Sequence, residues 1–152
     1  MDIEVKVKLI RAFEGQGDVV PSYGTAGSAG MDLRACIEAP IMIEGGQIVK
    51  IPTGIAIQIP NRYVGGFVFP RSGLSSKYGI SLINSVGVID SDYIGEIICP
   101  MVNHSDKSFT ITPGDRIAQL VFMPVCNAAL IQVDDLQETE RGSGGFGSTG
   151  LK

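Results

Sequence analysis

Short runs of β-branched and other apolar residues, separated by glycine and proline, recur along almost the whole chain. These runs lie at 3–9, 31–37, 47–51, 54–59, 64–69, 80–83, 86–90, 93–99, 108–112 and 117–122. Helical periodicity is scarce, and many short strands with frequent turns are typical of an all-β sandwich, barrel or jelly roll. At most one short helix is expected, over 72–78, with Gly79 placed to end it.

Length and charge restrict what this chain can be. With 152 residues, 44% of them apolar, it is expected to form one domain with its own core. The net charge of −4 argues against a nucleic-acid-binding face, and no apolar run is long enough to span a membrane. Residues 1–9 alternate apolar and charged residues, which indicates a strand rather than a signal peptide, so a cytoplasmic location is expected.

The chain is expected to divide into two regions. Residues 1–133 carry all the strand-like runs and are predicted to form a β-barrel domain, whereas residues 134–152 form an acidic linker and a glycine-rich tail. Two readings of the tail are open. It is either a mobile end, as most Gly/Ser-rich segments are, or a phosphate-binding segment with Arg141 as the anion partner and Phe146 as a stacking ring.

Cysteine and histidine give little sign of a metal or nucleophile site. Cys36, Cys99 and Cys126 are far apart, lie near apolar residues and show no metal-ligand spacing, so buried free thiols are expected and a zinc site is not. His104 is the only histidine and lies in a polar turn, where a solvated side chain is expected.

Residues 87–97 carry the densest chemistry in the chain. Two apolar runs flank an acidic turn with Asp90 and Asp92 beside Tyr93, which reads as strand, tight turn, strand. The segment is either a plain hairpin or a small polar pocket with a carboxylate base and a stacking ring.

Two further segments place polar residues on predicted strands. Asp32 and Arg34 lie on the same side of the strand at 31–37, where they form either a surface ion pair or part of a site. Gln119 interrupts the apolar run at 117–122, and an inward-facing amide there needs hydrogen-bond partners.

The start of the predicted helix also has two readings. Arg71, Ser72 and Gly73 follow a strand, so the backbone N–H groups and the arginine could face an anion. Alternatively, Ser72 is a simple helix cap.

Together and in order, the segments SAGMDLRA, PRSGLSSKYGI, GVIDSDYIGEI, PGDRIAQLVF and RGSGGFGSTG resemble the five motifs of the trimeric dUTPases, deoxyuridine 5′-triphosphate nucleotidohydrolases. The resemblance extends from the first strand to the tail. It implies a homotrimer of jelly-roll-like subunits, with active sites shared at the subunit boundaries.

The resemblance also assigns roles to the acidic residues. It implies that Asp90 holds and deprotonates the attacking water, and that Asp32 holds Mg²⁺ through the water ligands of the metal. This use of one carboxylate and several waters fits the coordination habits of magnesium. Arg34 and Arg116 are expected outside the site, as supporting or subunit-interface groups.

The remaining site residues follow from the same resemblance. Those expected to contact phosphate are Arg71, Ser72, Gly73, Gln119, Arg141, Ser143 and Gly144. Those whose backbone is expected to read the uracil edge are Asn84, Val88, Ile89, Asp90 and Ile98. Phe146 is expected to stack on uracil, and Tyr93 to lie under the deoxyribose, where it leaves no room for a 2′-hydroxyl.

The function implied is Mg²⁺-dependent hydrolysis of dUTP to dUMP and pyrophosphate, which keeps uracil out of DNA and supplies dUMP for thymidylate synthesis. The alternative is a dCTP deaminase, or a bifunctional dCTP deaminase/dUTPase, of the same fold. Deamination needs an additional acid/base glutamate near the base, and Glu96 is the only nearby candidate. A third reading is an inactive nucleotide-binding trimer.

Overall fold

The structure is a computed structural model, and it describes residues 2–12 and 20–145. Its elements, in chain order, are β1 (Lys6–Leu9), β2 (Met31–Arg34), β3 (Ile41–Ile43), β4 (Ile48–Gln58), β5 (Val64–Pro70), α1 (Ser72–Tyr78), β6 (Ile80–Leu82), β7 (Gly87–Ile89), β8 (Glu96–Asn103), β9 (Phe109–Ile111) and β10 (Arg116–Pro124). The predicted all-β class with one short helix is confirmed.

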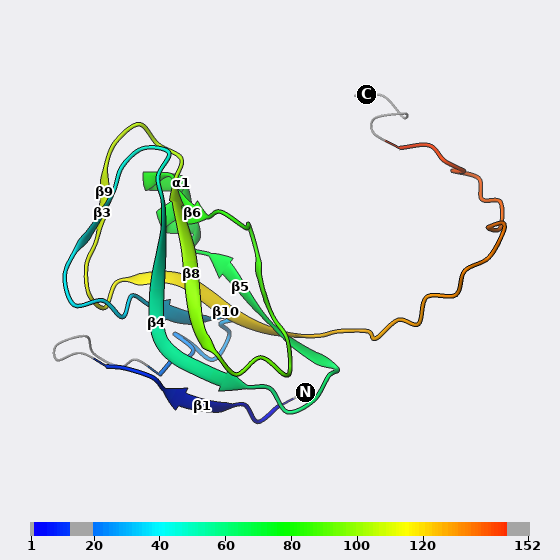
Figure 1. The fold of residues 1–152 in the computed structure, drawn as a ribbon, viewed down its shortest axis with the longest axis horizontal. Helices are drawn as coiled ribbons and strands as arrows, with labels where there is room; N and C mark the ends of the chain where they lie inside the picture. Colours follow the sequence, from blue (N-terminus) through cyan, green and yellow to red (C-terminus); the bar gives the residue numbers. More distant parts are fainter. Residues whose placement is uncertain (1, 13–19, 146–152) are drawn as a thin grey trace.

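Two four-stranded sheets enclose the core in a jelly-roll-like arrangement. Their strand orders are β1-β4-β8-β6 and β2-β10-β5-β7, every pairing is antiparallel, and β3 and β9 form a separate two-stranded sheet. Leu33 and Ile117 from the second sheet join Ile51 and Met101 from the first in one buried cluster. Figure 1 shows β4 and β8 side by side, and the segment after β10 running away from the sheets.

Two predicted strands, 47–51 and 54–59, form the single strand β4. The expected break at Pro52 is instead a β-bulge, with the register against β8 shifting between Pro52 and Ala56. Gly54 has a φ of +75° at this bulge, a conformation that favours glycine because it has no Cβ. Strand β3 was not predicted, because three residues are too few to show a period.

Helix α1 begins and ends as predicted, but the reading of Ser72 as its cap is wrong. Arg71 occupies the N-cap position without a side-chain hydrogen bond, and Ser72 is the first residue of the helix. Gly79 ends the helix in the left-handed conformation, and its N–H donates to the carbonyl of Ser75. The preceding strand β5 therefore runs almost directly into the helix.

The plain-hairpin reading of residues 87–97 is also wrong. Strand β7 pairs with β5 in one sheet, whereas β8 pairs with β4 and β6 in the other. The acidic turn therefore connects two sheets, and among the described strands β7 and β8 are not hydrogen-bonded to each other. The apolar runs in the sequence correctly predicted each strand, but they carried no information about which strand it would pair with.

The thiols differ in burial. Cys36 and Cys99 are buried as expected, and burial raises the pKa of the Cys99 thiol to about 12. Cys126 is exposed, because it follows the end of β10 and has left the core, so the expectation of three buried thiols is wrong. His104 is exposed in its turn as predicted. Within the described residues, no helix is both long and apolar enough to cross a bilayer.

Candidate functional site

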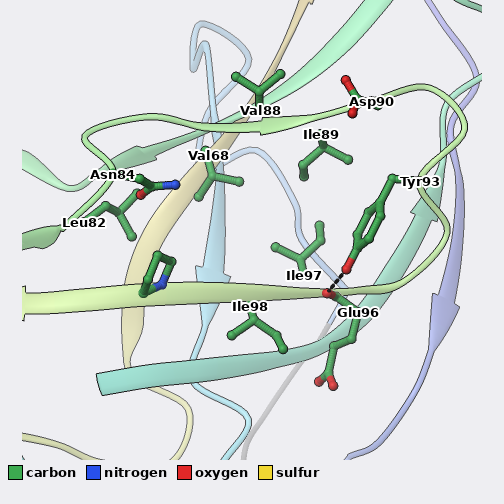
Figure 2. A pocket seen from close by; sticks show the side chains of 12 residues that line it. Val68, Leu82, Asn84, Val88, Ile89, Asp90, Tyr93, Glu96, Ile97 and Ile98 are labelled. Atoms are coloured by element: carbon green, nitrogen blue, oxygen red, sulfur yellow. Dashed lines mark hydrogen bonds between the residues drawn. The ribbon is translucent and has the colours of Figure 1, made fainter. Parts of the chain in front are cut away.

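A cavity of about 250 Å³ lies where β7 and β8 diverge into different sheets. Figure 2 shows the residues of β7 on one side of it and those of β8 on the other. Its lining contains all six residues that the sequence predicted around the base and sugar, namely Asn84, Val88, Ile89, Asp90, Tyr93 and Ile98. The same lining includes Glu96, Ile97 and Pro100.

Backbone groups of β8 face this cavity. On the edge of β8 that faces β6, the N–H of Ile83 donates to the carbonyl of Pro100 at 2.9 Å. Carbonyls of residues two apart in a strand point to the same edge, so the carbonyl of Ile98 also points there. On the other edge, Pro52 faces Ile98 but gives its carbonyl to the N–H of Cys36, which marks a non-hydrogen-bonded pair. Among the described strands, none pairs with β8 at Ile98 on the cavity side, so its backbone is open to a ligand.

Tyr93 closes one end of the cavity. Its N–H donates to the carbonyl of Asp90 at 3.1 Å, and its hydroxyl donates to the carbonyl of Glu96 at 2.9 Å (Figure 2). A Cβ on Gly95 would lie 2.5 Å from that hydroxyl oxygen and 2.6 Å from the ring carbon that bears it. Sequence reasoning missed Gly95, although a glycine two residues after an aromatic in a turn is a usable signal of close approach.

Asp90 directly follows β7 and has an exposed side chain. Val88 and Asp90 point to one face of the strand, whereas Ile89 points to the other and is 6% exposed (Figure 2). Within the described part of the chain, the Asp90 carboxylate has no hydrogen bond or ion pair. It also borders a second cavity of about 510 Å³, beside Phe67 and Ser91. The carboxylate can therefore accept hydrogen bonds from a bound water.

The carboxylate of Glu96 is turned away from the cavity. One of its oxygens accepts the N–H of Gly54 at 2.9 Å, and the other pairs with the guanidinium of Arg11. Figure 2 shows this carboxylate on the far side of β8 from Tyr93. The one glutamate that sequence reasoning offered as a deaminase acid/base is thus already engaged elsewhere.

A second cluster joins three sequence segments around Asp32. Its Oδ1 lies 2.9 Å from Nε of Arg71, and its Oδ2 lies 3.1 Å from Nη1 of Arg116. Arg71 also donates from Nη1 to the carbonyl of Arg116 at 3.2 Å. Of the two readings of Asp32 and Arg34, the ion pair between them is therefore wrong, since Arg34 instead donates to the carbonyl of Gly114 at 2.9 Å. Arg116, expected outside the site, is a direct partner of Asp32.

Strand register explains this cluster. Gln119 on β10 is opposite Asp32 on β2 and opposite Phe69 on β5, so the ends of the three strands meet. The amide nitrogen of Gln119 donates to the carbonyl of Pro70 at 3.1 Å, which supplies a partner that the sequence required. The cluster holds one carboxylate, two guanidinium groups and one amide.

The remaining predicted phosphate contacts, at the start of α1 and in the tail, do not line the cavity between β7 and β8. Ser72 and Gly73 are exposed at the start of α1, and a Cβ on Gly73 would meet nothing within 4 Å. In the tail, Arg141 donates from Nε to the carbonyl of Gly144 at 2.9 Å, and Ser143 is exposed. Phe146 lies outside the described residues. Figure 1 shows residues 134–145 well away from the sheets.

The side chains around Asp32 can be compared with those that a magnesium ion needs as ligands. Within residues 2–12 and 20–145, no group of three or more His, Cys, Asp or Glu side chains is placed to hold a metal ion. Asp32 is a single carboxylate whose two oxygens are taken by guanidinium groups. These residues fit a magnesium ion only if the substrate phosphates and waters supply most of its ligands, which is the usual arrangement at nucleotide sites.

Comparisons with known proteins agree with this geometry. The family model described as dUTPase matches residues 18–150. The deoxyuridine 5′-triphosphate nucleotidohydrolase of Desulfitobacterium hafniense is 52% identical over 147 residues, covering 97% of each chain. The same enzyme of Acinetobacter baylyi is 49% identical over 150 residues, covering 99% of this chain and 100% of the relative. A Staphylococcus bacteriophage 80alpha dUTPase solved with dUpNHpp superposes with a TM-score of 0.85 at 27% identity, covering 97% of this chain and 99% of the other. The chain therefore belongs to the dUTPase family and is a dUTP diphosphatase.

Proposed function

We propose that the protein hydrolyses dUTP to dUMP and pyrophosphate, by attack of a water molecule on the α-phosphorus. The observation that carries the proposal is the cavity between β7 and β8, where open backbone, Tyr93 and the exposed Asp90 surround one space. The bacteriophage relative was solved with dUpNHpp, a dUTP analogue, which supports a nucleotide as the ligand. The reaction removes dUTP from the pool of DNA precursors, and its product dUMP supplies thymidylate synthesis.

The cavity suits a uracil ring. Uracil presents acceptor, donor and acceptor groups along one edge. We expect the backbone at Ile98, with Asn84 and residues 88–90, which all line the cavity, to bind this edge. A base with the wrong edge leaves buried groups unpaired, at a cost of roughly 1–3 kcal/mol each. Thymine has the correct edge with an added methyl group, which a close-fitting cavity rejects by overlap.

Asp90 is the proposed general base. A water bound to its carboxylate attacks the α-phosphorus and gives its proton to that carboxylate as the bond to the pyrophosphate oxygen breaks. A carboxylate is a weak base, so most of the acceleration must come from positioning the water and neutralising the phosphate charge. The absence of any hydrogen bond to the Asp90 side chain within the described residues leaves it able to play this part.

Phosphate binding is proposed to draw on more than one subunit. The phosphate contacts are expected from Arg71, Ser72, Gly73, Gln119, Arg141, Ser143 and Gly144, with Phe146 closing over uracil. In a single chain none of these described residues lines the cavity between β7 and β8, and residues 134–145 extend away from the sheets of the same chain. A homotrimer with shared sites would bring them together.

Magnesium is the proposed cofactor. Asp32 would hold it through water rather than directly, because both carboxylate oxygens already face arginines. When bound, the ion supplies charge neutralisation on the triphosphate. The arginines contribute in the same sense, and Arg71 is held ready by Asp32 and by the carbonyl of Arg116.

The deaminase alternative is not favoured, since Glu96 is bound to Gly54 and Arg11 and does not face the base. A cytoplasmic location, and the division of the chain into a domain at 1–133 and a tail at 134–152, stay predictions.

The decisive assay is release of pyrophosphate with Mg²⁺ from dUTP, dTTP, dCTP and UTP at equal concentration. Selective turnover of dUTP, abolished by a chelator and strongly reduced in Asp90→Asn with dUTP binding retained, is the expected result. Near-normal turnover by Asp90→Asn would remove Asp90 from its role, and ammonia release from dCTP would revive the deaminase.

The tail is tested separately. Deleting residues 141–152 should leave the protein folded and assembled while removing most of the activity. Mixing this truncated chain with Asp90→Asn, and allowing subunits to exchange, should restore part of the activity if the sites are shared. Full activity of the truncated chain alone would refute the closing role of the tail.

A further inference from the structure

Glu96 has contacts on both sides of β8, at the cavity and on the side facing β4. The side chain of Glu96, at the start of β8, accepts the N–H of Gly54 at 2.9 Å and pairs with Arg11. Gly54 lies in the β-bulge of β4, and its carbonyl in turn accepts the N–H of Ile10 at 2.8 Å. The carboxylate therefore joins β8, the bulge and the segment after β1, on the far side of β8 from Tyr93 (Figure 2).

The backbone of the same residue faces Tyr93. The Glu96 carbonyl accepts the Tyr93 hydroxyl at 2.9 Å, while the Tyr93 N–H is bonded to Asp90 in the turn. Tyr93 is thus held at its backbone N–H and at its hydroxyl, although the residue is 46% exposed. Gly95 allows this placement, because a Cβ there would lie within 2.9 Å of three ring and hydroxyl atoms.

We propose that Glu96, anchored by Arg11 and Gly54, is a positioning residue for sugar discrimination, because it fixes the carbonyl that holds the Tyr93 ring. The proposal rests on the proposed function, in which Tyr93 excludes a 2′-hydroxyl. It adds that the exclusion depends on an ion pair outside the cavity. If the carboxylate is lost, the start of β8 can shift, the hydroxyl loses its acceptor, and the ring can swing away.

This role differs from simple stabilisation of a strand end. A purely structural glutamate would lower turnover of dUTP and UTP by the same factor. A positioning residue acting through Tyr93 changes the ratio of the two kcat/KM values, chiefly by improving UTP. One neutral hydrogen bond is worth about fivefold in an equilibrium, so a loss of discrimination of roughly three- to tenfold is expected.

The experiment measures kcat and KM for dUTP and UTP in Glu96→Ala, Glu96→Gln and Arg11→Met, with Glu38→Gln as a control that removes an exposed carboxylate elsewhere. Glu96→Gln keeps an acceptor for Gly54 and loses only the ion pair, so it tests the proposal even if Glu96→Ala fails to fold. Discrimination should fall most in Glu96→Ala, less in Glu96→Gln and Arg11→Met, and not in the control. An equal fall for both nucleotides in the folded variants would overturn the proposal.

A double-mutant cycle with Tyr93→Phe asks whether Glu96 acts through the ring. Without the hydroxyl, Glu96→Gln should add almost nothing to the loss of discrimination, and a full additional loss would contradict the proposal. The ring itself is followed without nucleotide by NMR of ¹³C-labelled tyrosine, with the Tyr93 signal assigned by its absence in Tyr93→Phe.

The two readouts separate the two proposals. If the Glu96 variants shift or broaden the Tyr93 signal but wild-type protein uses dUTP and UTP equally, the sugar role of Tyr93 fails while the anchor stands. If the Tyr93 signal is unchanged in every Glu96 and Arg11 variant, the anchor is refuted whatever the kinetics.

Discussion

Alanine at Gly54 should destabilise the protein much more than alanine at Gly46. The two glycines have nearly the same backbone conformation, with φ of +75° and +76°. They differ in surroundings, because a Cβ on Gly54 would lie 2.6 Å from Sγ of Cys36 and 2.7 Å from the carbonyl oxygen of Arg11, whereas one on Gly46 would meet nothing within 4 Å. The pair therefore separates the cost of the left-handed conformation from the cost of crowding.

The magnitudes follow from these surroundings. The left-handed conformation costs a non-glycine residue roughly 1–2 kcal/mol, and this applies at both positions. Overpacking a filled site adds typically about 1–3 kcal/mol, and this applies only at Gly54. We expect a loss of roughly 1–2 kcal/mol for Gly46→Ala and roughly 2–5 kcal/mol for Gly54→Ala. In a domain of this size each kcal/mol lowers Tm by about 2–4 °C.

The assay is thermal and urea unfolding followed by circular dichroism, with both variants and wild type at one protein concentration, because any assembly would couple stability to concentration. Gly54→Ala should unfold at lower temperature and lower urea than Gly46→Ala. Equal unfolding free energies for the two variants would refute the reasoning, since the backbone cost alone would then account for both. A larger loss at Gly46 would refute it more strongly.

Three further predictions rest on single interactions. Thr53→Val should cost roughly 1–3 kcal/mol of unfolding free energy in urea titrations, because the buried hydroxyl donates to the carbonyl of Ile97 at 2.7 Å and valine leaves that acceptor unpaired; an unchanged midpoint would contradict this. Because burial raises the pKa of the Cys99 thiol from 9.0 to about 12, it ionises first in the unfolded chain. Stability should therefore be fully retained below about pH 9 and decline above it, by at most about 1.4 kcal/mol per pH unit. Cys99→Ala, compared with wild type across that range, should lack this slope, and an identical slope in both would exclude the thiol as its source. Asp32→Asn should lower kcat/KM for dUTP on the order of tenfold, because Arg71 loses its charged partner at 2.9 Å. Excess Mg²⁺ should restore only part of that activity, because metal cannot replace the charged partner of Arg71, and full recovery with metal would show that Asp32 acts through the ion alone.

The sequence predicted most of the elements, because strand alternation and helix-ending glycines are local signals. Helix 72–78 and nine of the ten strands were recognised, although β4 was predicted as two strands separated at Pro52. Strand β3 has only three residues and shows no period, so no local signal exists for it.

For the site, the sequence determined which residue types are available: an exposed aspartate after a strand, a tyrosine in a turn, arginines beside glycines. Only the tertiary structure decided their partners. Asp32 pairs with Arg71 and Arg116 rather than with Arg34 two residues away, because the register of β2, β10 and β5 brings distant strand ends together.

The cavity itself is a tertiary feature. Alternation along 87–97 fits a hairpin as well as two strands of different sheets, since side-chain period does not encode the hydrogen-bonding partner. Whether β7 pairs with β8 or with β5 depends on contacts across the whole chain, and the choice of β5 leaves the open backbone at Ile98 and the space under Tyr93. The sequence by itself thus determined the chemical groups available for the site, while the cavity in which they act was decided by the pairing of strands distant in sequence.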